Sequence, residues 1–157
     1  MRTHFSTLLL INAVVTSLAA IAQDHPPMRG AVAMGFDQHA TAHHFLLAAD
    51  GGAIEVAANA TNDAVNRDAI REHLREIAAQ FRLGVFDKPF ATHGEVPPGV
   101  PVLQRLHESV SYQYEETSTG ARVRIRTSNR EALAALHDFL RYQIAEHHTG
   151  DPTSIRK

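Results

Sequence analysis

The residues best able to do chemistry in this chain are its histidines. The sequence contains 11 of them and no cysteine. Without thiolates, imidazole is the best side-chain ligand left for copper, zinc, nickel or iron ions. Histidines also occur as ordinary surface and core residues, so their positions must separate ligands from the rest. The composition therefore predicts a transition-metal site, to be located from the elements that carry the histidines.

Four histidines occupy positions from which they could reach one site. His73 and His137 lie on the apolar faces of two predicted helices, where a buried imidazole needs a hydrogen-bond partner or a metal ion. His44 opens a predicted strand. His93 lies in a long proline-containing connection, a common place for a functional residue. We therefore expect three or more of these four residues to bind one ion.

Three further histidines are secondary candidates. Neighbouring strand residues point to opposite faces, so His43 and His44 cannot both join an inward site. His147 and His148 end the last predicted helix, where cationic side chains are favoured without any ligand. His148 shares the helical stripe of His137, although a rise of about 16 Å separates the two. His43, His147 and His148 therefore rank behind the first four.

No known catalytic signature accompanies the histidines. The sequence has no HExxH or CxxCH motif, no GxSxG nucleophile elbow and no glycine-rich phosphate loop. We interpret the chain as a histidine-rich protein that holds one copper or zinc ion for binding, delivery or sensing. The alternatives are a mononuclear metalloenzyme, a non-covalent haem binder using the same histidines, and a metal-free dimeric interaction module.

The first 22 residues have the three parts of a secretory signal peptide. A basic start precedes an apolar stretch from Phe5 to Ile21, and Ala20-Ile21-Ala22 is a small-x-small cleavage site. Polar residues interrupt the stretch, which falls short of the about 20 apolar residues of a membrane helix. We expect cleavage after Ala22 and a periplasmic or secreted mature chain without a membrane span.

Net charge and cysteine content limit the kinds of binding partner that the chain can have. The net charge is −2 at pH 7, whereas a nucleic-acid binder carries a clear basic excess. The lack of cysteine excludes a disulfide framework and a lipoprotein anchor. The strand predicted over 42–49 is apolar on both sides, so it is either central and covered or part of a homodimer interface. The expected partners are a metal ion and a second copy of the chain.

The secondary-structure elements predicted to carry the histidines form two similar halves of the chain. Hydrophobic periodicity predicts strands over 42–49, 53–58, 110–116 and 121–127, and helices over 64–83, 102–108 and 130–148. Asp50-Gly51-Gly52 is interpreted as a hairpin turn. Residues 85–101 are interpreted as a long connection, and Ser128 with Glu131 as a capping box.

The predicted fold class is α+β. We expect a four-stranded antiparallel sheet with helices on one face. Gly52–Val56 resembles Gly120–Ile125, and an amphipathic helix follows each, so the order ββα could have arisen by duplication. The predicted organisation is a signal peptide over 1–22, an extended arm over 23–41, a single domain over 42–150 and a tail over 151–157.

Several segments resemble an uncharacterised group of small exported bacterial proteins. They are Gly35-Phe36-Asp37-Gln38, Thr41-Ala42-His43-His44-Phe45, Thr92-His93-Gly94 with Pro97-Pro98-Gly99, and His137-Asp138-Phe139-Leu140 with Glu146-His147-His148-Thr149-Gly150-Asp151. The resemblance covers most of the mature chain and implies export. It transfers no activity, but it favours His44, His73, His93 and His137 over the other histidines.

Overall fold

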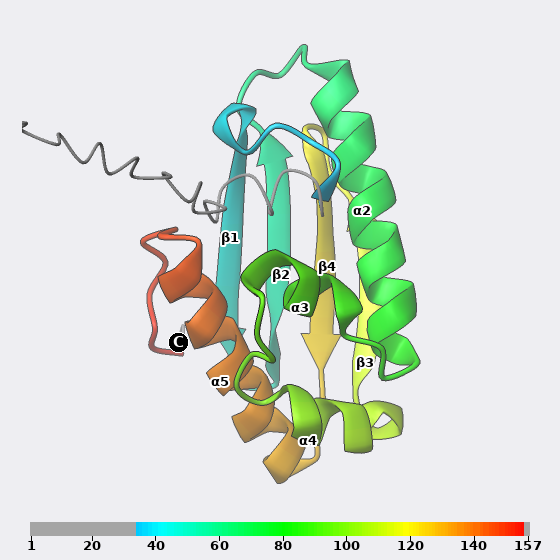
Figure 1. The fold of residues 1–157 in the computed structure, drawn as a ribbon, viewed down its shortest axis with the longest axis vertical. Helices are drawn as coiled ribbons and strands as arrows, with labels where there is room; N and C mark the ends of the chain where they lie inside the picture. The colour runs from blue at the N-terminus through cyan, green and yellow to red at the C-terminus, as the bar shows by residue number, and fades with distance from the viewer. Residues whose placement is uncertain (1–33, 156–157) are drawn as a thin grey trace, which may run out of the picture.

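The computed structural model of the chain describes residues 34–155 (Figure 1). The predicted signal peptide and residues 23–33 of the predicted arm lie outside this range. The elements are η1 (Gln38–Ala40), β1 (Thr41–Ala48), β2 (Gly51–Ala58), α2 (Ala64–Arg82), α3 (Asp87–His93), α4 (Val100–Arg105), η2 (His107–Ser109), β3 (Ser111–Glu116), β4 (Gly120–Arg126) and α5 (Arg130–Glu146). The long predicted strands and helices are therefore present, with shifts at their ends.

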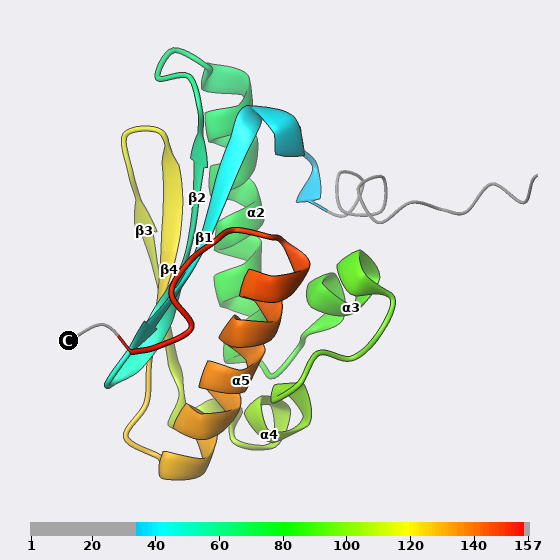
Figure 2. The same ribbon diagram turned by 90° about the vertical axis from the view of Figure 1, so that its left-hand side faces the viewer.

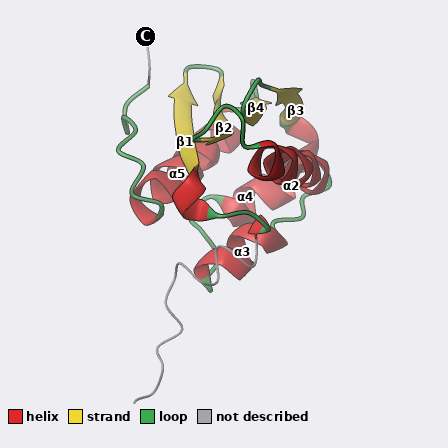
Figure 3. Cartoon of the chain, turned by 90° about the horizontal axis from the view of Figure 1, so that it is seen from above, coloured by secondary structure: helices red, strands yellow, loops and turns green. Residues whose placement is uncertain are grey.

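The strands form one four-stranded antiparallel sheet in the order β1-β2-β4-β3. The two central strands, β2 and β4, pair with each other, and Ile54 lies opposite Val123 near their middle. The helices of residues 34–155 lie on one face of this sheet (Figures 2 and 3). The predicted α+β fold, with helices on one face of an antiparallel sheet, is confirmed.

Each half of the chain covers strands of the other half. α2 follows β2 but packs mainly on β3 and β4, whereas α5 follows β4 and packs on β1 and β2. The short helix α3 lies between them, over the centre of the sheet (Figure 1). The order ββα thus occurs twice, and the exchange of helices joins both halves in one hydrophobic core.

The first hairpin turns earlier than predicted. Ala49 and Asp50 alone join β1 to β2, so both glycines after them belong to β2. A side chain at Gly52 would collide with Leu140 of α5, and Gly51 has a φ of 150°. Glycine is required here by close packing rather than by the turn. The prediction took Gly51 and Gly52 as part of the turn and therefore placed the start of β2 too late.

The connection between the halves is more ordered than predicted. Residues 85–101, expected to be a loop, contain α3, which ends where Gly94 adopts a φ of 75°. α4 begins at Val100, with Pro101 in its first turn, where a missing backbone N–H costs nothing. The prolines of this segment therefore mark helix starts, and the helix predicted over 102–108 is replaced by α4 and η2.

The cap of α5 also differs from the prediction. The side chain of Asn129 accepts hydrogen bonds from the backbone N–H groups of Glu131 and Ala132. Asn129 is therefore the N-cap, and the predicted capping box on Ser128 is wrong. Asparagine and serine are comparable caps, so the local sequence offered two adjacent choices and the chain uses the second.

Both ends of the described chain pack against the domain. Met34 and Phe36 are each 6% exposed and belong to the core, so residues 34–40 are not an extended arm. After α5 the chain turns back along β1 (Figure 2), and Asp151 accepts a hydrogen bond from the backbone N–H of Phe45 at 2.9 Å. β1 is an edge strand, not a central one, and this contact covers part of its free edge.

Candidate functional site

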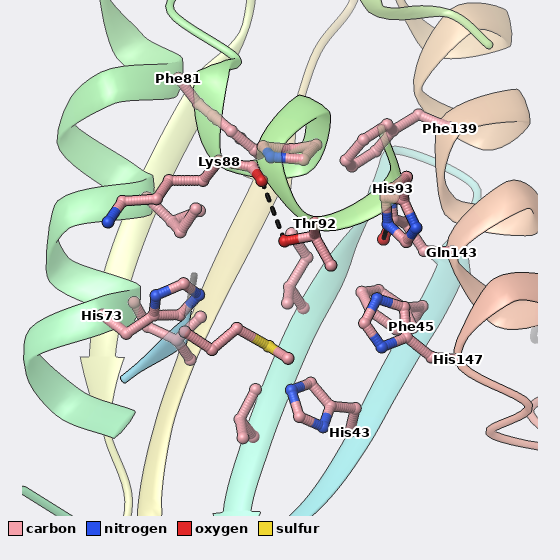
Figure 4. A pocket seen from close by; sticks show the side chains of 16 residues that line it. His43, Phe45, His73, Phe81, Lys88, Thr92, His93, Phe139, Gln143 and His147 are labelled. Carbon is pink, nitrogen blue, oxygen red and sulfur yellow. Dashed lines mark hydrogen bonds between the residues drawn. The ribbon is translucent and has the colours of Figure 1, made fainter. Parts of the chain in front are cut away.

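A cavity of about 50 Å³ lies between the sheet and helices α2, α3 and α5 (Figure 4). Four histidines from four separate places line it: His43 of β1, His73 of α2, His93 of α3 and His147 directly after α5. Most of the other lining side chains are apolar, and none of the lining residues of the described chain is an aspartate or a glutamate. The fold therefore gathers imidazoles into a largely apolar space.

β1 carries the first of these histidines inward. Phe45 and Leu47, which share the face of His43, are 4% and 2% exposed. His44 faces the opposite side, with 48% of its side chain exposed. The ring of Phe36 stacks on His43 with centroids 5.7 Å apart. Within residues 34–155 the buried Nε2 atom of His43 has no hydrogen-bond partner. The predicted preference for His44 over His43 is therefore wrong.

The end of α5 selects His147 rather than His148. α5 ends at Glu146, and His147 is its C-cap. His148 has a φ of 51° and is exposed, so the chain leaves the helix at this residue. The helical stripe of His137 therefore does not extend to His148. The ring of His147 instead lies against Phe45, with centroids 5.2 Å apart.

α3 brings His93 over the cavity. The side chain is 7% exposed, and its Nδ1 atom lies 4.0 Å from Oε2 of Glu146. The Nε2–H group of His93 donates to Oε1 of Gln143 at 3.0 Å. Tyr142 lies edge-on to the ring at 5.2 Å. His93 thus ends a helix rather than lying in a loop, and side chains of α5 hold its ring in place.

His73 occupies the opposite wall. Figure 4 shows it across the cavity from His43, His93 and His147. It lies on α2 next to Leu74, and Phe36 meets its ring edge-on at 5.5 Å. The other three rings form a row. His147 lies 5.3 Å from His43 at an interplanar angle of 23°, and 5.2 Å from His93 at 88°.

Burial lowers the pKa of three of these rings. It lowers the pKa of His43 and of His73 from 6.5 to about 4, and that of His147 to about 3. Repulsion from neighbouring cationic groups, such as Lys88 beside His73, lowers the pKa values further. These imidazoles are therefore neutral near pH 7, the form in which a ring nitrogen offers a lone pair.

His44, a primary candidate from the sequence, lies outside the cavity and has a partner of its own. Its Nδ1 atom lies 3.0 Å from Oδ1 of Asp151. The pair fastens the C-terminal segment to the outer side of β1. The prediction that His44 shares a site with His73 and His93 is therefore wrong.

His137, the other misplaced candidate, is buried beneath the first hairpin. Its Nε2 atom lies 3.0 Å from the carbonyl oxygens of both Ala48 and Gly51. The ring N–H therefore bridges the end of β1 and the start of β2. The sequence argument that a buried imidazole needs a partner holds here, but the partner is the backbone, and His137 does not join the cavity.

The cavity presents nitrogen and sulfur donors. Besides the four imidazoles, Met34 contributes a thioether to the lining. No three His, Asp or Glu side chains of residues 34–155 have donor atoms already placed to hold one metal ion. A volume of about 50 Å³ holds a few waters at about 10–15 Å³ each. An ion with a small ligand fits this space, whereas a haem is too large for it.

Sequence reasoning ranked His43 and His147 second and did not consider Met34. A usable signal existed for His43, because the bulky residues Phe45 and Leu47 share its strand parity. Met34 carries no such signal, since it precedes β1 in a segment without periodicity. Its place in the cavity depends on how residues 34–40 fold back over the sheet.

Comparisons with models of known protein families, with curated protein sequences and with solved structures found no match. The case for function therefore depends on the cavity itself. Among the helices formed by residues 34–155, none is both long and apolar enough to cross a membrane.

Proposed function

We propose that this chain is a periplasmic protein that binds one copper or zinc ion in the histidine cavity. The ligands are nitrogen atoms of His43, His93 and His147, with His73 on the opposite wall as a further donor. This set keeps two of the four residues favoured by the sequence and replaces His44 and His137. The observation that carries the proposal is the convergence of four histidines from four elements on one small apolar cavity.

The spacing of the rings supports a shared ion. Nitrogen ligands about 2.0–2.1 Å from a tetrahedral ion place their ring centroids about 5 Å apart. The centroids of His147 and its two neighbours are already separated by 5.2 and 5.3 Å. A shared ion requires the rings to rotate first, because those of His43 and His147 are stacked at an interplanar angle of 23°. For His93 this rotation exchanges the hydrogen bond to Gln143 for a metal bond.

Unsatisfied polar atoms give the second line of support. The buried Nε2 atom of His43 and the buried Nε2 atom of Gln143 have no hydrogen-bond partner within the described chain. Burying a polar group without a partner costs about 1–3 kcal/mol. A bound ion would use the lone pair at His43 and so remove the cost at that atom.

The lining favours binding over catalysis. A general acid or base in a cavity of this kind is usually a carboxyl group or a histidine free to exchange protons. The cavity has no carboxylate among its described lining residues, and its histidines serve as the ligands. We therefore assign the chain a role in binding, delivery or sensing of the ion.

A metal titration of the untagged full chain tests this proposal. Zn²⁺ and Cu²⁺ are added separately near pH 7, and heat or a competing chelator reports affinity and stoichiometry. We expect one ion per chain. His147→Phe keeps an aromatic ring against Phe45 and removes both nitrogens, and it should weaken binding by about 100-fold or more, since even residues that only support ligands contribute about 10–100-fold.

Two control variants separate the cavity from histidine content in general. His39→Ala removes an exposed histidine of η1, and His148→Asn replaces the neighbour of His147 with a residue that tolerates its positive φ. Both should bind the ion like the native chain. Absence of binding near pH 7, or equal losses in the control and cavity variants, would overturn the proposed site.

A further inference from the structure

The donor set of the cavity points to a particular ion. We propose that the site selects Cu(I), with the thioether sulfur of Met34 as a ligand beside the imidazoles. This inference rests on the proposed metal-binding function and specifies its ion and oxidation state. It adds a ligand from the segment that precedes β1, outside the set of histidines.

The chemistry of the donors carries the first step. The lining offers imidazole nitrogens and one thioether, and the described lining residues include neither a carboxylate nor a thiolate. Thioethers are soft ligands that select Cu(I), whereas carboxylates suit harder ions. Zn²⁺ sites in proteins draw on thiolate, imidazole and carboxylate ligands. Met34 therefore contributes to a Cu(I) site and adds little to a Zn²⁺ site.

The charge of the ion carries the second step. All the candidate ligands are neutral, and the one charged side chain among the described lining residues, Lys88, is paired with Glu76 at 3.1 Å. The cost of burying an ion in an apolar medium rises with the square of its charge, so a dication costs about four times as much as a monocation. With no anionic ligand to offset that cost, the cavity favours the singly charged ion.

The position of Met34 carries the third step. Met34 is 6% exposed and lines the cavity, two residues before Phe36. The ring of Phe36 contacts both His43, at 5.7 Å, and His73, at 5.5 Å. Phe36 thus holds the segment against the histidines of two different elements, and Met34 lines the cavity from this packed segment.

The test compares two ions on the untagged full chain. Cu(I) is measured without oxygen against a chromophoric Cu(I) chelator, and Zn²⁺ against a zinc indicator. We expect Cu(I) to bind more tightly than Zn²⁺. Met34→Leu keeps the apolar volume and removes the sulfur, and it should weaken Cu(I) binding by about tenfold or more while leaving the Zn²⁺ affinity within about threefold.

X-ray absorption at the copper edge provides a readout that a purely structural role would not change. The native chain should show one sulfur neighbour among nitrogens, and Met34→Leu should show nitrogen only. Ile125→Leu is the matched control, because Ile125 is a buried core residue that does not line the cavity and carries no donor atom. It should leave both affinities and the spectrum unchanged.

The outcomes distinguish this inference from the proposed function. Tighter binding of Zn²⁺ than Cu(I), or a Met34→Leu variant with native Cu(I) affinity and no sulfur neighbour in the native spectrum, overturns the Cu(I) assignment. The histidine site then stands with another ion. If neither ion binds, the proposed function itself fails.

Discussion

Two regions along α5 each hold a histidine against other elements, and they do so in opposite ways: His137 is buried and His147 is half-buried. In the first turns of the helix, His137 lies beneath the β1–β2 turn, with its Nε2 atom 3.0 Å from two backbone carbonyl oxygens. At the other end, His147 lies among the rings of His43, Phe45 and His93. The backbone satisfies the first ring, whereas the surroundings of the second are aromatic and desolvating.

The comparison separates a structural histidine from a candidate ligand. Fixed carbonyl acceptors lock the tautomer and orientation of His137, so this ring is part of the framework. Burial lowers the pKa of His147 to about 3 and favours its neutral form, which leaves a lone pair available to a ligand. A buried histidine on an apolar helix face is thus ambiguous until its neighbours from other elements are known.

The largest expected effect is the pH dependence of the metal-free chain. His43, His73 and His147 have a pKa of 6.5 when unfolded and of about 4, 4 and 3 when folded. Between these values the unfolded chain binds protons that the folded chain does not. Stability should therefore fall as the pH drops from about 6.5 to about 4, by up to about 1.4 kcal/mol per pH unit for each ring.

Urea unfolding at a series of pH values measures this slope. Above about pH 6.5 these three rings should add no pH dependence. His147→Phe removes one of the three protonation sites and should make the slope shallower over the same range. Equal slopes in the native chain and the variant would contradict the assignment of His147 as a buried neutral ring.

The next effect concerns the framework histidine. His137→Ala leaves the carbonyl oxygens of Ala48 and Gly51 without their donor and opens a small cavity, so it should lower the free energy of unfolding by about 2–3 kcal/mol. Metal affinity, measured below the unfolding transition, should remain native. A variant that kept full stability but lost metal binding would reverse the roles given to the two regions of α5.

The smallest effect concerns the contact that fastens the C-terminal segment. The side chain of Asp151 is 7% exposed and accepts from the backbone N–H of Phe45, next to the cavity. Asp151→Ala should cost about 1 kcal/mol and speed hydrogen exchange at the Phe45 amide. His44→Ala keeps that backbone contact and serves as control. Native exchange at Phe45 in Asp151→Ala would show that the edge of β1 is protected by other means.

Local signals determined most of the secondary structure. The helices expected over 64–83 and 130–148 are found at Ala64–Arg82 and Arg130–Glu146, because a 3.6-residue apolar period and an adjacent cap are properties of the segment itself. Alternation likewise located the strands. The errors occur where one local signal has two possible meanings. The glycines after Asp50 serve close packing rather than a turn. The prolines in the expected loop over 85–101 accompany two helices, α3 and α4.

The site depended on tertiary structure. The sequence by itself predicted histidine as the candidate ligand and grouped His73 with His93, and both residues line the cavity. It also determined that only one of His43 and His44 can face inward, since the parity of a strand is local. Which of the two does so depends on the face that α2 and α5 cover.

The other choices have the same physical origin. His147 replaces His148 because α5 ends at Glu146, and His137 leaves the set because the end of β1 supplies acceptors to its ring. Met34 enters because its segment folds back over the sheet. Each depends on atoms far away in the sequence, and packing between distant segments is the information that neither composition nor periodicity contains.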